Sequence, residues 1–113
     1  MAAHIKRFDE LTQRILVGLH EAFPAARYIG PNEAGLSDEA PALNTSGGRS
    51  ASDEWHTLDT ELAGVLTWLV EQGLVHDRQN KFGASHILTA RGFEVLHRLD
   101  PKYEIPAVAR LLD

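Results

Sequence analysis

The sequence predicts an α+β fold in which a few helices pack around a small antiparallel sheet. Three observations predict it: an amphipathic helix over residues 53–72, a hairpin over residues 74–89, and a final helix that begins after Thr89 and ends before Pro101. A chain of 113 residues, of which 43% are hydrophobic, is long enough to bury one core. We therefore expect a single domain over residues 1–113.

The helix over residues 53–72 is predicted by its apolar spacing. Its aliphatic residues recur at steps of three and four, which places them on one helical face: Leu58, Leu62, Val65, Leu66 and Leu69. Ser52 or Asp53 can cap its start, and Gly73 can end it because glycine adopts the left-handed conformation at low cost. We expect Leu66, Trp68 and Leu69 to lie against Phe8, Leu11 and Ile15 of the first helix, and Trp68 also to pack under the hairpin.

The hairpin is predicted by a polar run between two short apolar runs. Strands over residues 74–78 and 84–88 flank the sequence Gln79-Asn80-Lys81-Phe82-Gly83, which is polar and ends in glycine, as a hairpin tip requires. Thr89 then follows the second strand and can cap the final helix.

The first half of the chain carries weaker patterns. Residues 5–23 form an amphipathic helix with a stripe of apolar side chains, and Pro24 ends it: Phe8, Leu11, Ile15, Leu19 and Phe23. Residues 27–30 are a candidate short strand that could pair with the hairpin, and residues 33–38 are a candidate short helix. We expect a flexible loop over residues 40–52, where small, polar and helix-breaking residues gather.

The second half of the chain resembles a known family. The segment LTWLVEQGLV, a short hairpin and then LTARGFEVL are similar to the recognition helix, wing and final helix of bacterial and phage-type winged-helix proteins. The resemblance implies an α+β winged helix with three to four helices, a two- to three-stranded sheet and a wing over residues 74–89. It also implies a DNA-binding transcriptional regulator that acts as a dimer and contacts DNA mainly through the wing.

The candidate nucleic-acid contacts lie on the wing and beside it. They are the polar and basic residues whose side chains can reach phosphates: Arg78, Gln79, Asn80, Lys81 and Arg91. The same residues would also suit a polar hairpin tip that only keeps the edge soluble. The recognition-position helix itself contains no lysine or arginine, which counts against DNA binding.

Charge favours an alternative function, a protein-interaction module of the same fold that does not bind DNA. The net charge is −5, and residues 31–61 alone carry seven acids against one arginine. The acidic face over residues 33–61 would then dock a partner, with Trp55, Asp59 and Glu61 as contacts. Trp55 could equally be a core residue that closes one end of the helix.

Composition excludes several other classes of function. The chain has no cysteine, so disulfides, cysteine-ligated zinc and a thiol nucleophile are excluded, and a cytoplasmic location is the simplest interpretation. Six scattered histidines lack metal-ligand spacing, and no phosphate-binding loop or nucleophile–base pair is present. We expect no enzymatic activity, no cofactor, no metal and no membrane association.

The C-terminal segment over residues 101–113 is a candidate dimer arm. It carries four aliphatic residues with little sequence left to cover them: Ile105, Val108, Leu111 and Leu112. The alternative is that this segment packs on the first helix of its own chain.

Overall fold

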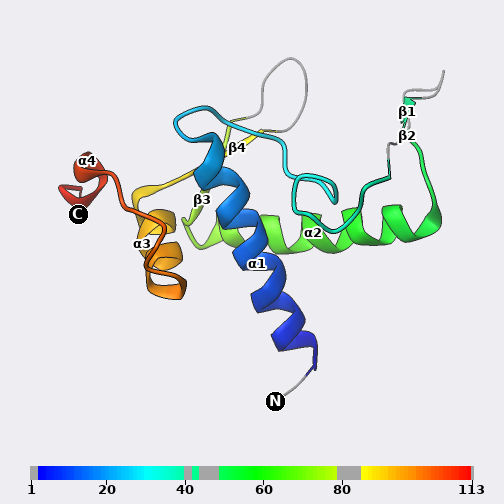
Figure 1. The fold of residues 1–113 in the computed structure, drawn as a ribbon, viewed down its shortest axis with the longest axis horizontal. Coiled ribbons are helices and arrows are strands. Elements are labelled where there is room, and N and C mark those ends of the chain that lie inside the picture. The colour runs from blue at the N-terminus through cyan, green and yellow to red at the C-terminus, as the bar shows by residue number, and fades with distance from the viewer. Residues whose placement is uncertain (1–2, 40–41, 44–48, 79–84, 113) are drawn as a thin grey trace.

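The protein is an α+β arrangement of helices around a hairpin (Figure 1), seen in a computed structural model that describes residues 3–39, 42–43, 49–78 and 85–112. Helix α1 (Ala3–Ala22) crosses α2 (Asp53–Glu71), and the hairpin of β3 (Val75–Asp77) and β4 (His86–Leu88) follows. Helices α3 (Ala90–Leu99) and α4 (Ala107–Arg110) complete the chain.

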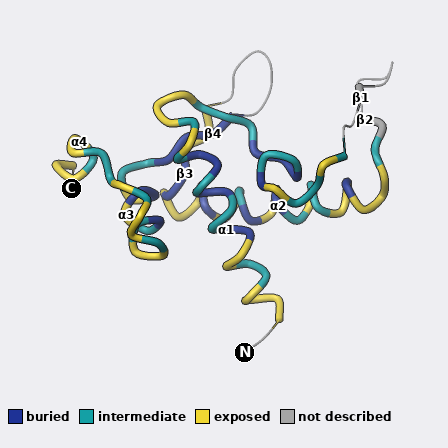
Figure 2. The backbone as a smooth tube through the Cα atoms, viewed as in Figure 1, coloured by how far each residue is buried: buried dark blue, intermediate teal, exposed yellow. Residues whose placement is uncertain are grey.

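The core lies where α1, α2, α3 and the hairpin meet. Figure 2 shows that the first turns of α1 are exposed, and that the helix becomes buried where it crosses α2. The buried stripe of α1 contains Leu11, Ile15 and Leu19, as the sequence predicts, together with Leu16. Phe23, the last residue of the predicted stripe, lies beyond the helix and is exposed. Leu62, Val65 and Leu69 of α2 face it in the same cluster.

Both predicted caps of α2 are confirmed. The Ser52 hydroxyl accepts a hydrogen bond from the Trp55 amide at 3.1 Å, which satisfies one of the free donors of the first turn. At the other end Gly73 has φ +77°, and the Leu74 amide donates to the Leu69 carbonyl at 3.0 Å. This is the Schellman arrangement, and it turns the chain directly into β3.

The hairpin is a two-stranded antiparallel sheet. Val75 pairs with Leu88 and Asp77 with His86, so the strands lie inside the ranges that the sequence predicts. The predicted strand over residues 27–30 is reduced to one bridge, in which the Arg27 amide donates to the His86 carbonyl at 2.9 Å and the His86 amide returns the bond at 3.0 Å. The described sheet therefore has no third strand.

The predicted helix over residues 33–38 is wrong. Residues 31–36 form turns instead, in which the Leu36 amide donates to the Pro31 carbonyl at 2.8 Å. Gly35 has φ +73°, a conformation that a helix interior does not contain, and it stops any helical start within one turn.

Residues 40–52, predicted to be a loop, contain a short strand pair. Strands β1 (Ala42–Leu43) and β2 (Arg49–Ser50) pair antiparallel just before α2 begins. Two-residue strands are too short to produce an alternating pattern, so the sequence carries no signal for them.

One close packing joint holds α3 to the hairpin. The Thr89 hydroxyl accepts from the Gly92 amide at 3.1 Å, donates to the Gly73 carbonyl at 2.6 Å, and thus confirms the predicted cap. The Thr89 amide donates to the Leu74 carbonyl at 3.1 Å. Gly92 is buried against that same carbonyl oxygen, so this turn of α3 needs a residue without a side chain.

The two tryptophans differ in their surroundings. Trp68 is 44% exposed, and its ring stands edge-on to Phe8 with centroids 5.2 Å apart. The predicted contact of Trp68 with Phe8 is confirmed, but it lies at the exposed end of α1, so the ring is not buried under the hairpin. Leu69 is buried as expected, and Leu66 is partly buried against the core.

Candidate functional site

Arg78 is the one predicted nucleic-acid contact of the hairpin whose position the structure describes. Its backbone is fixed to the residue before β4, because its amide donates to the Ser85 carbonyl at 2.8 Å and its carbonyl accepts from the Ser85 hydroxyl at 2.8 Å. Its exposed side chain makes no ion pair with any described residue. Gln79, Asn80 and Lys81 lie outside the described residues.

Arg91 is not brought together with Arg78. Arg78 follows β3 on the side of the hairpin tip, whereas Arg91 lies in the first turn of α3, beyond the Val75–Leu88 pair at the other end of the sheet. Arg91 instead lines a groove with Arg110 and Leu112 of the C-terminal segment. A single phosphate track across both arginines therefore has no basis in the sheet geometry.

The acidic face contains carboxylates that bind within the protein. Glu61 accepts two hydrogen bonds from the Arg7 guanidinium, both at 3.1 Å, and this pairing raises the pKa of Arg7. Asp59 accepts from the Tyr28 hydroxyl at 3.3 Å. These two predicted partner contacts are thus half-buried and already engaged by donors on other segments.

Glu39 serves the start of α2 in a similar way. Its carboxylate accepts from both the amide and the hydroxyl of Ser52 at 2.7 Å, and these bonds lower the pKa of Glu39. The acid therefore holds the capping residue of the helix in place. The charge of residues 31–61 is in part a set of internal acceptors, which composition alone does not reveal.

The exposed face of α2 is consequently neutral along most of its length. Apart from the acids at its ends, its exposed residues are small, hydroxyl-bearing or aromatic, with one histidine: His56, Thr57, Thr60, Ala63, Gly64, Thr67 and Trp68. Exposed acids are confined to the two ends of the helix, at Asp53, Glu54 and Glu71. The carboxylates expected to oppose DNA lie mainly to the sides of this face.

Trp55 is a core residue. It is 2% exposed, and its indole Nε1 donates to the Asn32 side-chain oxygen at 2.8 Å. This confirms the interpretation that Trp55 closes one end of the helix, and the indole offers no exposed surface to a partner. Asn32 was missed because its role depends on the turn over residues 31–36.

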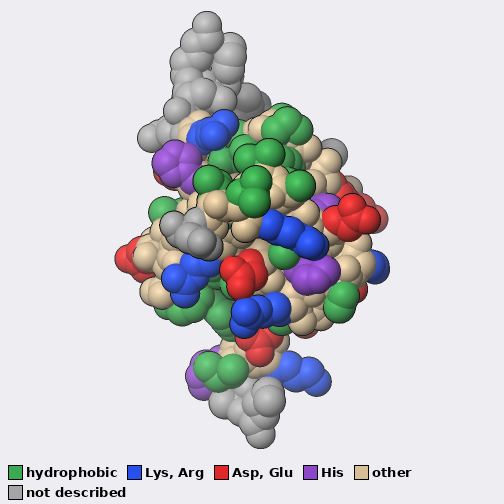
Figure 3. All heavy atoms as spheres, turned by 90° about the vertical axis from the view of Figure 1, so that its left-hand side faces the viewer, with side chains coloured by type: hydrophobic (Ala, Val, Ile, Leu, Met, Phe, Trp, Pro, Cys, Tyr) green, Lys and Arg blue, Asp and Glu red, His purple; other side chains and the backbone are tan. Residues whose placement is uncertain are grey.

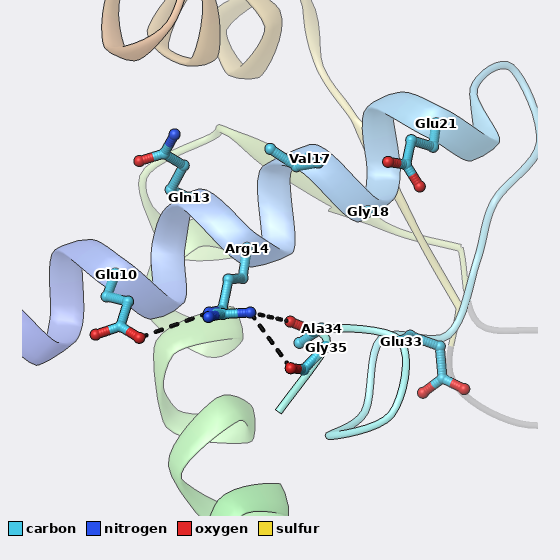
Figure 4. A pocket seen from close by; sticks show the side chains of 9 residues that line it. All are labelled: Glu10, Gln13, Arg14, Val17, Gly18, Glu21, Glu33, Ala34 and Gly35. Atoms are coloured by element: carbon cyan, nitrogen blue, oxygen red, sulfur yellow. Dashed lines mark hydrogen bonds and ion pairs between the residues drawn. The ribbon is translucent and has the colours of Figure 1, made fainter. Parts of the chain in front are cut away.

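A cleft of about 450 Å³ lies between α1 and that turn (Figure 4). Arg14 reaches across it and donates to the carbonyls of Ala34 at 3.0 Å and Gly35 at 3.4 Å, with Glu10 at 3.6 Å. Glu33 accepts from the Gly30 amide at 2.9 Å. The charged groups of this cleft therefore fix the turn against α1, which is a structural role.

A second cavity, of about 400 Å³, lies between α2 and the hairpin; we call it the hairpin cavity. It is lined by residues of three separate segments: Tyr28, Ile29, Asp59, Ala63, Leu66, Thr67, Val70, Glu71, Asp77 and His86. Three of these side chains are carboxylates, and none of the described lining residues is lysine or arginine. No sequence pattern marks this set, because its members come together only when the hairpin folds onto α2.

His86 is the unusual group of the hairpin cavity. It is 7% exposed, and its Nδ1 has no hydrogen-bond partner among the described residues. Burial lowers the pKa of His86, and the nearby charge of Asp77 partly opposes that effect. An unsatisfied buried nitrogen costs about 1–3 kcal/mol, which makes this position notable in a small domain.

The C-terminal segment divides into a packed part and an exposed part. Tyr103, Ile105 and Ala109 pack against the core, and the His20 imidazole hydrogen-bonds to the Glu104 carbonyl at 3.0 Å. The remaining aliphatic residues stay exposed: Val108, Leu111 (81% exposed) and Leu112. Figure 3 shows hydrophobic side chains gathered on the face that carries α4.

Comparison with known proteins adds no relative. No family model matches the chain, and neither a curated protein nor a solved structure does. Within the described ranges no three His, Asp or Glu side chains are grouped so that they could hold a metal ion. None of the described helices has the length and apolar character needed to cross a membrane.

Proposed function

We propose that this protein is a DNA-binding regulator of the winged-helix type, with α2 in the recognition position and the β3–β4 hairpin as the wing. The consecutive elements α2, β3, β4 and α3 support this proposal, together with the close contacts at Gly73 and Gly92 that fix the hairpin between two helices. Because winged-helix folds serve several functions, the argument for DNA binding must come from the residues of the site and not from the fold alone.

The observation that carries the proposal is the combination of a neutral α2 face with a hairpin arginine, Arg78, that pairs with no acid among the described residues. A duplex can approach threonine hydroxyls and small side chains without the repulsion that exposed carboxylates would cause. Arg78 would then supply a phosphate contact beside that face. With a net charge of −5, we expect the affinity to be low and to fall steeply with salt.

Replacing Arg78 with alanine should weaken DNA binding at every sequence. Loss of one phosphate contact should also reduce the slope of log K against log salt by about 0.9. Fluorescence anisotropy at low ionic strength, with random duplexes and fragments from upstream of the gene, measures both quantities.

Arg98→Ala is the matched control, because that arginine is exposed on α3 and already paired with Glu94 at 3.0 Å. Undetectable binding of the unmodified protein to all duplexes at low salt would contradict the DNA-binding proposal. Equal effects of the two substitutions would remove Arg78 from the interface.

The regulator would act as a dimer through the exposed aliphatic residues of the C-terminal segment. Isologous pairing of Val108, Leu111 and Leu112 would cover side chains that the protomer leaves in water. We expect Leu111→Ser with Leu112→Ser to shift the protein toward monomer in sedimentation velocity at micromolar concentration. Unmodified protein that is already monomeric there would remove the dimer from the proposal.

A protein-interaction module without DNA binding is the second candidate, and the excess of acids over residues 31–61 favours it. Asp53 and Glu54 are exposed at the start of α2 and make no ion pair with any described residue. A charge-reversal test of partner binding is therefore best made at Asp53 and Glu54. At Asp59 and Glu61 it would also break the contacts with Tyr28 and Arg7.

A further inference from the structure

We propose that the hairpin cavity binds a small organic cation, an ammonium group carried on an apolar body. The volume of about 400 Å³ lies within the range of ordinary small-molecule sites. The cavity is built on α2 and the hairpin, with Tyr28 and Ile29 between α1 and the turns closing one side.

The charges around the cavity select the sign of the ligand. Asp59, Glu71 and Asp77 all line it, and the described lining contains no basic side chain apart from His86. The Tyr28 hydroxyl, at 3.3 Å from one oxygen of Asp59, fixes that carboxylate at the edge of the cavity. A carboxylate or phosphate ligand would face three like charges here, whereas an ammonium would be attracted by all three.

The apolar lining of the cavity favours a ligand whose ammonium group is carried on an apolar body. Aliphatic side chains from α2 and the segment before it supply the apolar surface: Ile29, Ala63, Leu66 and Val70. Ile29 belongs to the core, and Leu66 and Val70 pack against it, so most of this surface is anchored in the core. A bare metal ion or a small polar cation would leave this surface unused, while an aliphatic or aromatic amine would cover it.

His86 provides an independent indication that something binds here. Its side chain is more than nine-tenths buried, lines the same cavity, and has an Nδ1 without a partner among the described residues. Because burial lowers its pKa, the imidazole is neutral at pH 7 and one of its nitrogens can accept a hydrogen bond. Nδ1 itself has almost no accessible surface, so a ligand N–H would reach it only when the imidazole turns toward the cavity, and would then satisfy a nitrogen that the protein leaves unpaired.

The test uses three probes of matched size and different charge: 2-phenylethylamine, 3-phenylpropionate and 3-phenylpropanol. In ¹⁵N-resolved NMR titrations of the full chain, we expect saturable shifts only with the amine, at the amides of Ala63 and Thr67 and at the His86 ring. Glu71→Gln and Asp59→Asn should each weaken amine binding by about five-fold or more. Glu94→Gln on α3 is the matched control and should leave the affinity unchanged.

Several results would overturn the proposal. They are the absence of saturable shifts at millimolar amine, equal binding of the propionate, shifts that map outside the cavity, or no loss in both acid variants. Glu71 is exposed, so its variant tests the charge even where Asp59→Asn disturbs folding. The inference does not depend on DNA binding, which the Arg78 experiment tests separately.

Discussion

Replacing Gly92 with alanine should lower the free energy of unfolding by about 2 kcal/mol or more. A β-carbon at this position would overlap the Leu74 carbonyl oxygen, which is backbone and already accepts from the Thr89 amide at 3.1 Å. Relief would require α3 to move away from the hairpin, and the buried Phe93 and Leu96 would move with it. Urea denaturation followed by tryptophan fluorescence gives the change directly.

Gly64→Ala is the matched control for this prediction. Gly64 is an exposed glycine in the interior of α2, and a β-carbon there would meet nothing within 4 Å. Alanine should therefore stabilise the protein by about 0.5–1 kcal/mol through helix propensity alone. A Gly92→Ala protein as stable as the unmodified one would show that the joint between α3 and the hairpin is looser than the structure indicates.

The features that could be predicted from the sequence are those that local chemistry determines. Ser52, Gly73 and Thr89 cap helices through atoms within a few residues of themselves, so their neighbours in the sequence identify them. The apolar spacing of α1, α2 and α3 likewise predicts their buried faces. In the motif LTARG the Thr89 cap is local, whereas the requirement for Gly92 arises from its contact with the distant Leu74 carbonyl.

The features that could not be predicted depend on contacts between distant segments. Arg27 forms a single bridge with His86 in place of the predicted strand, and such a pairing of distant segments leaves no pattern in the sequence. The contact of Trp68 with Phe8 follows from the apolar pattern, but its exposure does not, because the crossing of α1 over α2 places this contact at an exposed end. Helix propensity and apolar periodicity do not specify where two helices cross.

The residues of the candidate site likewise include some that the sequence could predict and some that it could not. A polar, exposed Arg78 follows from its place beside a hairpin tip. The engagement of Glu61 does not, because its partner Arg7 lies 54 residues away in the sequence. The hairpin cavity joins residues from α2, β3, β4 and the segment after α1, so no window of sequence contains it. Because such carboxylates are engaged by distant partners, the exposed face of α2 is less acidic than the net charge of the segment indicates.

Replacing Leu69 with alanine should lower the free energy of unfolding by about 2–5 kcal/mol. Leu69 is fully buried in the cluster where α2 meets Leu11 and Ile15 of α1, and Leu74 beyond the helix cap belongs to the same cluster. The substitution removes apolar contacts and leaves a cavity that three packed elements surround, so little collapse is available. Its backbone carbonyl still accepts from Leu74, which keeps the cap intact and isolates the packing effect.

Two further leucines turn this prediction into a graded test. Leu66 is only partly buried and lines the hairpin cavity, so Leu66→Ala should cost less, about 1–2 kcal/mol. Leu99 is exposed by more than half at the end of α3, and Leu99→Ala should change the stability by about 0.5 kcal/mol or less. Equal losses for Leu66→Ala and Leu69→Ala in the same denaturant series would contradict this placement of α2, because the helix would then be rotated so that both leucines face the core.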